Sequence, residues 1–363
     1  MIIDEVIYNI DRGREGLNEG LYMGFPKLLS IVPGVQMGTV YDICGGTGSG
    51  KTAFSLSSFV FNPYDDYLQK RASGINIQLQ IEIWSMEMSA AILITKAVAR
   101  KIFKEHHILT DINYILSRGK NRISQEMYDL VLSTRKYFEE MENIVHIHTA
   151  SNPTGIHKTI KSHMLQNGKE IYEPLEIMEH GQPKIIQSFT RYIPNHPNRY
   201  YIAMQDHVAL QKQEAGSPNV KALVDRLVNY IIDDKLRYNI TDVLVQQINR
   251  ASESIDRQKL NSIDIQLSDL RDTSDTAHAA DFVIGLANPY QYEISPYRGY
   301  DIRRLQDRFR SVKIVKARDG QANIVLGMGF IGEIGAFREL PSGKLMTEDD
   351  YKAILKPQKA YTN

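Results

Sequence analysis

Eight consecutive residues have the types and spacing of a loop that binds phosphate. They satisfy the pattern G-x-x-x-x-G-K-[ST] and are Gly45, Gly46, Thr47, Gly48, Ser49, Gly50, Lys51 and Thr52. Glycines let backbone N–H groups turn inward around phosphate oxygens, and the N-terminus of a following helix adds partial positive charge. Lys51 can reach the β- and γ-phosphates, and the Thr52 hydroxyl can bind Mg²⁺. The motif therefore predicts that the chain hydrolyses a nucleoside triphosphate, ATP, with Mg²⁺.

This chemistry also requires carboxylates at the ends of other strands. Asp206 follows an apolar run at 200–205 and is placed to organise the magnesium ion, although it could equally be an ordinary strand-end aspartate. Glu87 follows an alternating segment at 75–84 and could orient or deprotonate the attacking water. A glutamate at the start of a helix, interacting with its dipole, is the alternative for Glu87. Local sequence leaves both choices open.

Strands and helices that alternate along the chain must position these groups. The apolar patterns predict helices at 52–60, 90–105, 124–141 and 219–237. They predict strands at 39–44, 75–84, 143–149, 200–205, 241–247, 281–286, 311–317 and 322–328. This order favours an α/β fold around a mostly parallel sheet flanked by helices.

Composition is that of an ordinary globular protein. The 363 residues are 42% apolar and 24% charged, with 43 basic and 43 acidic side chains, so net charge indicates neither a nucleic-acid nor a membrane partner. Cys44 is the single cysteine, which excludes an intramolecular disulfide and suits a reducing compartment. The sequence has no signal-peptide pattern and no apolar run long enough to span a bilayer. We expect a cytoplasmic protein with no membrane partner.

The chain divides into a large domain and smaller appendages. Residues 1–20 are expected to form an arm or linker helix, and residues 21–340 the main domain. Prolines and turn signals interrupt the pattern at 152–199, which indicates an insertion with a hairpin-bearing loop. The polar segment 341–363 is expected to be a peripheral tail.

Several short segments, in order along the chain, resemble those of the hexameric DnaB-type replicative helicases, within the RecA-like group. The segment G-F-P-K-L at 24–28 resembles the lead-in to the phosphate loop of that family. The others are S-M-E-M-S at 85–89, D-H-V-A-L at 206–210, Q-Q-I-N-R at 246–250, L-S-D-L-R-D at 267–272, D-F-V-I at 281–284 and V-K-A-R-D-G at 315–320. Together they cover about residues 20–340.

The resemblance implies a RecA-like P-loop NTPase core and assigns roles to residues. Glu87 would be the catalytic base, Asp206 the magnesium-organising aspartate, and Gln247 the residue that senses the γ-phosphate. Lys316 and Arg318 would reach across a subunit interface to the nucleotide of a neighbour, whereas two isolated basic residues would by default lie at a solvated strand end. The family implies a hexameric ring with ATP at subunit interfaces and single-stranded DNA in its channel.

The resemblance also places a DNA-gripping role on Arg271 and Asp272, although a structural ion pair is an equal alternative for Arg271. The chain departs from the family in three ways. Only some twenty residues precede the core, where the family has a collar domain of about a hundred residues that recruits primase. The spacing between Glu87 and Asp206 is long, and Ser274 and His207 replace a glycine and an aromatic residue.

These observations favour an ATP-driven DNA helicase of DNA replication, with an unidentified primase or loader as a further partner. Two alternatives stay open. A RecA-like recombination ATPase would share the core and form filaments instead of rings. A nucleotide-switched assembly or regulatory module would hydrolyse ATP without unwinding DNA, and the short N-terminal segment and Ser274 are compatible with it.

Overall fold

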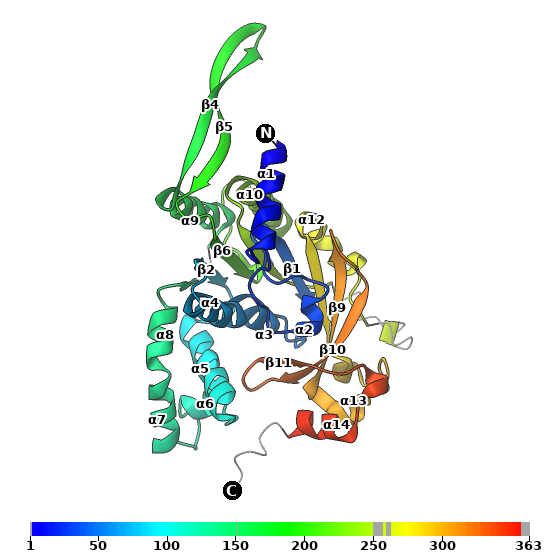
Figure 1. Ribbon diagram of the computed structural model, residues 1–363. Coiled ribbons are helices and arrows are strands. Elements are labelled where there is room, and N and C mark those ends of the chain that lie inside the picture. Colours follow the sequence, from blue (N-terminus) through cyan, green and yellow to red (C-terminus); the bar gives the residue numbers. More distant parts are fainter. Residues whose placement is uncertain (1, 150, 250–256, 259–262, 357–363) are drawn as a thin grey trace.

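A nine-stranded sheet forms the centre of the molecule, which we describe from a computed structural model of residues 2–149, 151–249, 257–258 and 263–356 (Figure 1). The strand order is β11-β10-β9-β8-β1-β7-β6-β2-β3, with the six strands from β8 to β3 parallel and β9, β10 and β11 antiparallel. The strands are β1 Val40–Gly45, β2 Gln78–Ser85, β3 Val145–His148, β6 Arg199–Asp206, β7 Thr241–Gln247, β8 Phe282–Ala287, β9 Phe309–Ala317, β10 Ile324–Ile331 and β11 Ala336–Glu339. The predicted α/β fold with a mostly parallel sheet is confirmed; of the strands in this sheet, only the four-residue β11 was not predicted.

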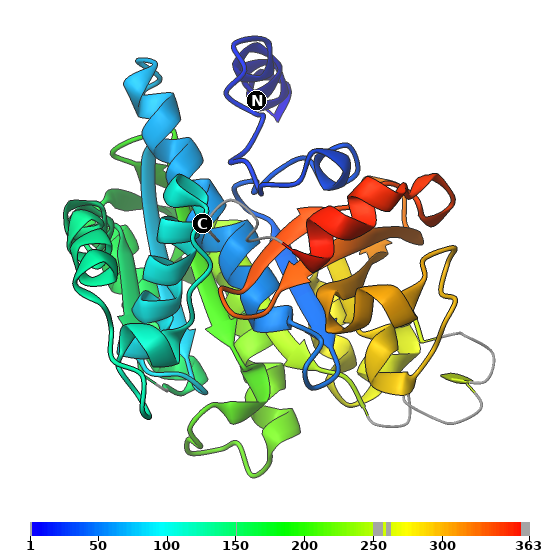
Figure 2. The ribbon, with the colours of Figure 1, turned by 90° about the horizontal axis from the view of Figure 1, so that it is seen from below.

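Helices cover both faces of this sheet because its strands alternate apolar side chains between two layers (Figures 1 and 2). On one face of the sheet, Ile43 and the strand side chains on the same side pack against α3 Lys51–Leu56, α4 Asn62–Ala72 and α5 Ala90–His106. On the other face, Cys44 and the strand side chains on the same side pack against α9 Pro153–Gln166 and α10 Val220–Tyr238. The remaining helices are α1 Ile2–Arg14, α2 Pro26–Leu29, α6 Ile112–Ile115, α7 Gln125–Ser133, α8 Arg135–Met141, α12 Ser274–Ala279, α13 Ile302–Leu305 and α14 Glu348–Leu355.

The helix expected at 52–60 continues to residue 72. It passes through a π-helical turn, η1 Ser57–Phe61, immediately before Pro63. Proline lacks the N–H that an α-helix interior requires, and one wider turn of backbone before it lets the helix continue. The helix expected at 124–141 is instead two, α7 and α8, separated at Thr134.

The segment 152–199 contains a helix that the sequence analysis missed. Pro153 is the first residue of α9 and not a breaker, because its missing N–H is tolerated there and the Asn152 side chain caps the helix. Ile156, Ile160 and Met164 recur at helical spacing and are buried in the core. After α9, strands β4 Gly168–Glu179 and β5 Gln182–Pro194 form a separate hairpin that projects from the molecule (Figure 1).

The two ends of the chain differ in how they pack. The tail that we expected to be peripheral includes α14, whose Tyr351 and Ile354 are buried together with Leu340. At the other end, α1 exposes a row of apolar side chains, Ile3, Val6, Ile7 and Ile10. Within the described ranges, none of the helices has the length and apolar character needed to cross a bilayer.

Two fully buried aspartates lie on the face of the sheet that α9 and α10 cover. Asp42 of β1 accepts hydrogen bonds from Gln246 and Thr276, and Asp242 of β7 accepts one from Gln205 at 3.2 Å. Burial raises the pKa of Asp42 to about 7 and that of Asp242 to about 8. Both carboxyl groups are therefore protonated in the folded chain over a pH range in which they are ionised in the unfolded chain.

Asp242→Asn is expected to stabilise the protein increasingly as pH rises. The pKa of Asp242 is raised on folding. The contribution of this carboxyl group to the free energy of unfolding is therefore present in full below the ordinary pKa of 3.8 and is lost as pH rises towards about 8. The wild type loses about 1.4 kcal/mol per pH unit through this group in that window, and the asparagine variant does not. Urea midpoints of both proteins at pH 5, 6, 7, 8 and 9 measure the difference. A difference that is constant with pH contradicts the prediction.

Candidate active site

The loop between β1 and α3 has the backbone of a phosphate cradle. Gly48 and Gly50 have φ of 75° and 87°, in the left-handed region that glycine adopts without strain. A side chain at Gly45 would place a Cβ 2.5 Å from the Ser49 hydroxyl and 2.7 Å from the Leu286 carbonyl. The loop leads directly into the N-terminus of α3 at Lys51. These glycines are therefore required by conformation and space, as expected for residues 45–52.

A buried arginine from a distant strand contacts the backbone of this loop and also lines the cavity beside it. The side chain of Arg310, at the start of β9, is 2% exposed and donates to the carbonyls of Ser49 at 3.1 Å and Gly48 at 3.3 Å. It also packs over the Phe330 ring. The C=O and N–H of a trans peptide point in opposite directions, so fixing the Ser49 carbonyl turns the Gly50 N–H away from Arg310. Sequence reasoning missed Arg310, which precedes the strand predicted at 311–317 and lies inside β9.

Arg310→Met is expected to weaken the binding of ADP and ATP at least about tenfold, because two loop carbonyls lose a charged donor. Arg308→Met is the matched control, since Arg308 lies two residues away and pairs with Glu333 instead of the loop. Titration with a fluorescent ADP measures both affinities. Equal affinities for the two variants would show that Arg310 does not position the loop.

Four adjacent strands bring the candidate catalytic residues to one edge of the sheet. The order β1-β7-β6-β2 places the phosphate loop, Gln247, Asp206 and Glu87 at successive carboxyl ends. Parallel strands share that edge, which is where open α/β sheets bind ligands. Asp206 lies opposite Ser85 of β2 in the sheet, and Glu87 follows two residues later. The structure therefore brings these residues together although they are far apart in sequence.

The pair Thr52 and Asp206 has the donor set that Mg²⁺ prefers. The Thr52 hydroxyl lies 3.3 Å from Asp206 Oδ1, so two hard oxygen ligands face each other beside the loop. Burial raises the pKa of Asp206 to about 6, an effect that the Thr52 hydrogen bond and Lys51 oppose. Among the described residues there is no cluster of three or more metal-binding side chains. A site with one carboxylate and one hydroxyl suits an ion whose other ligands are phosphate and water.

Lys51, Glu87 and Gln247 line the same cavity of about 440 Å³. Burial lowers the pKa of Lys51, and the charges of Glu87 and Asp206 counteract this effect. Gln247 donates from its side-chain amide to the Thr47 hydroxyl at 2.6 Å, which ties β7 to the loop. Beyond the loop, Lys96, Asp307 and Arg310 also line the cavity, and one wall comes from β10 and the turn to β11. Its residues there are Phe330, Gly332, Ile334 and Gly335.

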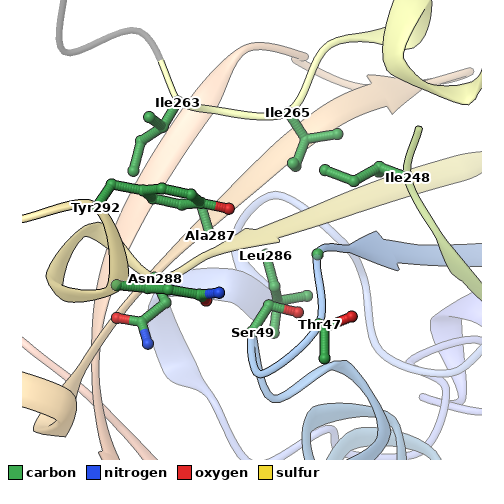
Figure 3. Close-up of a pocket in the computed structure, with 11 residues that line it drawn as sticks. Thr47, Ser49, Ile248, Ile263, Ile265, Leu286, Ala287, Asn288 and Tyr292 are labelled. Carbon is green, nitrogen blue, oxygen red and sulfur yellow. The ribbon is translucent and has the colours of Figure 1, made fainter. Parts of the chain in front are cut away.

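A second, smaller pocket lies behind the loop (Figure 3). Ile248, Ile263, Ile265 and Leu286 surround it together with Thr47 and Ser49 of the loop. Its volume is about 10 Å³, which is room for about one water molecule and none for a nucleotide. It is therefore not a substrate site.

Lys316 and Arg318 lie at the amino-terminal ends of the parallel strands, opposite the carboxyl ends where the loop lies. Arg318 pairs with Asp281 at 3.1 Å, and the Asp281 backbone hydrogen-bonds Val40 at the start of β1. The six residues of β1 therefore separate this edge from the loop, a span of about 20 Å. The Lys316 ammonium donates to the carbonyls of Ala277, His278 and Ala280 at the end of α12. Lys316 thus has a structural role within its own chain, whereas the Arg318 side chain is 50% exposed.

The candidate DNA contacts lie in a 3₁₀ helix, η4 Leu267–Thr273, which leads into α12. The side chains of Arg271 and Asp272 are outside the described residues. The backbone around them is held to the core, because Leu270 is buried and the Asn249 N–H donates to the Asp269 carbonyl at 3.1 Å. Whether Arg271 faces DNA or forms an ion pair therefore stays a prediction.

Fold and site together define a P-loop NTPase with a RecA-like core. Within that class, the fold is that of the ATPase domain of DnaB-type helicases. One solved structure, described as an ATPase domain, is 17% identical, with a TM-score of 0.63 over 93% of this chain and 99% of that chain. A DnaB-like replicative helicase, whose structure is described with its interactions with primase, is also 17% identical, with a TM-score of 0.64. That match covers 93% of this chain and 65% of that helicase. No model of a protein family matches the sequence, and no curated protein matches it.

Proposed function

We propose that this protein is an ATP-dependent DNA helicase that moves along single-stranded DNA as a hexameric ring in DNA replication. The observation that carries the proposal is that the candidate site residues lie at the two opposite ends of the parallel strands. The loop, Asp206, Glu87 and Gln247 gather at one edge, and Arg318 is exposed at the other. Arg318 could then serve only the nucleotide of a second copy, as an arginine that stabilises the transferring γ-phosphoryl group, and a head-to-tail ring supplies one at every site.

The residues divide the chemistry among them. Glu87 would orient and deprotonate the attacking water, while Lys51 and the loop N–H groups hold the phosphates. A magnesium ion held by Thr52 and Asp206 would neutralise charge on the β- and γ-phosphates. Gln247 would sense the γ-phosphate, since its side-chain amide already contacts Thr47 of the loop. Phe330 and Ile334, which line the cavity, would pack against the adenine ring of the nucleotide.

The DNA and assembly roles follow from the same arrangement. Arg271 and Asp272 would contact the phosphates of single-stranded DNA, which would give binding that is independent of sequence and sensitive to salt. The exposed apolar row of α1 would dock on a neighbouring subunit, with residues 1–20 serving as a linker arm. We place the protein in the cytoplasm, with a primase or helicase loader as a further partner.

Unwinding of a forked DNA duplex tests this function. Wild-type protein with ATP and Mg²⁺ should separate the strands, and Lys51→Ala and Arg318→Ala should not. A wild type that hydrolyses ATP but never separates strands, at any salt concentration or loading condition, defeats the helicase proposal. Helical filaments in electron micrographs would instead support the recombination ATPase. ATP hydrolysis that does not respond to single-stranded DNA would support the nucleotide-switched module.

A further inference from the structure

The β4–β5 hairpin has no partner for most of its length within the described part of the chain. Its base is anchored, because Tyr238 of α10 bonds Glu170, Arg237 packs over Phe189, and Tyr192 bonds the Met164 carbonyl. Beyond these contacts its strands pair only with each other. At 12 and 13 residues they extend for about 40 Å. A lone two-stranded hairpin is marginally stable in water, so this one is expected to be covered by another surface.

One face of the outer hairpin combines apolar side chains with an unpaired carboxylate. Glu176 lies directly across from Ile185, and Met178 is two residues farther along β4, so the three side chains share a face. Met178 is 69% and Ile185 72% exposed. Within the described ranges, the Glu176 carboxylate has no ion pair and no hydrogen bond, whereas Glu179 on the other face pairs with Lys184. A partner for this face must offer apolar surface and positive charge.

The same chain carries such a surface at its other end. The connection between α6 and α7 contains Arg118, Lys120 and Arg122 and no acidic residue from 116 to 122. Neither Arg118 nor Lys120 pairs with a carboxylate among the residues that the structure describes, and all three cations are exposed. Exposed apolar side chains flank them: Leu116, Tyr128 and Leu132.

The two surfaces lie at opposite ends of the molecule. The hairpin projects from the upper end in Figure 1, and α6 and α7 lie at the lower end. A head-to-tail contact joins one end of a copy to the opposite end of the next and closes into a ring when the rotation allows. Arg318 requires the same head-to-tail order if it serves a neighbour's nucleotide, so both contacts can form in one assembly.

We propose that the β4–β5 hairpin is an intersubunit arm whose outer face docks on the α6–α7 segment of the next copy of this chain. Glu176 would face Arg118 and Lys120, while Met178 and Ile185 would pack against Leu116 and Leu132. The inference rests on the proposed ring. It assigns to the hairpin a contact that is separate from both α1 and the nucleotide site.

Charge reversal on each side tests the contact. The variants are Glu176→Lys on the hairpin, Arg118→Glu with Lys120→Glu on the segment, and all three substitutions together. Mass photometry over a concentration series, with Mg²⁺ and a non-hydrolysable ATP analogue at low salt, measures assembly. Each single-side reversal should raise the concentration for half-assembly at least about tenfold, and the combined variant should return to within about threefold of the wild type. Raising the salt to about 0.5 M should shrink these differences, because it screens the charges more strongly.

Matched variants make the result specific. Glu173→Lys is the control on the hairpin, because Glu173 is an odd number of residues from Glu176 and its side chain points to the other face. It should assemble as the wild type does, as should Lys352→Glu on α14, a helix outside the proposed contact. Met178→Ser with Ile185→Ser should weaken assembly without rescue by the segment variants.

Three outcomes overturn the inference: single-side reversals that assemble normally, a combined variant no better than either side alone, or a wild type that stays monomeric. A Glu173→Lys protein as impaired as Glu176→Lys would also overturn it, since the effect would then be one of net charge. A wild type that forms rings but does not unwind DNA defeats the helicase proposal and leaves the arm intact.

Discussion

Glu87→Gln is expected to bind ATP as the wild type does and to lose about 10²- to 10⁴-fold in kcat, the usual worth of a general base. Glu87 is exposed in the cavity beside Lys51 and is not part of the loop that holds the phosphates. Glutamine keeps the size and hydrogen-bonding capacity of the side chain but cannot accept the proton of the attacking water. The loss should therefore appear in turnover and not in affinity.

Single-turnover hydrolysis and binding of a fluorescent ATP analogue separate these two effects. Glu105→Gln is the matched control, because Glu105 is a surface carboxylate of α5 paired with Lys101 and lies away from the cavity. A Glu87→Gln protein that turns over at the control's rate would show that Glu87 is only a residue at the start of a helix. A protein that no longer binds ATP would assign Glu87 to binding and remove it as the base.

The core could be predicted because its signals are local. The loop at 45–52 is contiguous, and each parallel strand is an apolar run that can be recognised without its neighbours. Asp206 and Glu87 could be placed at strand ends for the same reason. Their meeting at one edge follows from parallel pairing, which no single segment reveals.

Two of the three misses depend on contacts between distant parts of the chain, and the third is local. Arg310 acts on a loop residue 261 positions earlier, and nothing near Arg310 in the sequence indicates that contact. Pro153 was interpreted as a helix breaker, but proline is also common at the first position of a helix, which is where Pro153 lies in α9. Tyr351 and Ile354 look like isolated apolar residues in a polar tail until Leu340 is placed beside them.

Buried polar groups also support the catalytic edge in a way that residue types alone do not show. Gln246 and Gln205 each precede a candidate catalytic residue and point to the opposite face of the sheet, where they bond Asp42 and Asp242. These bonds cross from β7 to β1 and from β6 to β7. They therefore add side-chain bonds between the three strands that carry the loop, Gln247 and Asp206.

Arg318→Ala is expected to lower the ATPase rate about 10³-fold or more while the chain stays folded, in line with the loss of an arginine finger. In its own chain Arg318 makes a half-exposed ion pair with Asp281, which contributes little to stability. Lys316→Ala is the contrasting variant. Its ammonium caps the end of α12 through three carbonyls, so it should lower the urea midpoint of the protein as well.

Mixing two inactive proteins decides whether Arg318 acts on a neighbour. Lys51→Ala subunits lack a working loop and Arg318→Ala subunits lack the finger, so each homogeneous assembly should be inactive. After dissociation and reassembly in equal amounts, about a quarter of the interfaces join an intact loop to an intact Arg318, and about a quarter of wild-type activity should return if the sites act independently. If Arg318 served its own chain, no mixed interface would combine the two intact groups and the mixture would stay inactive. Because about 20 Å of β1 separates Arg318 from its own loop, recovery is the expected result.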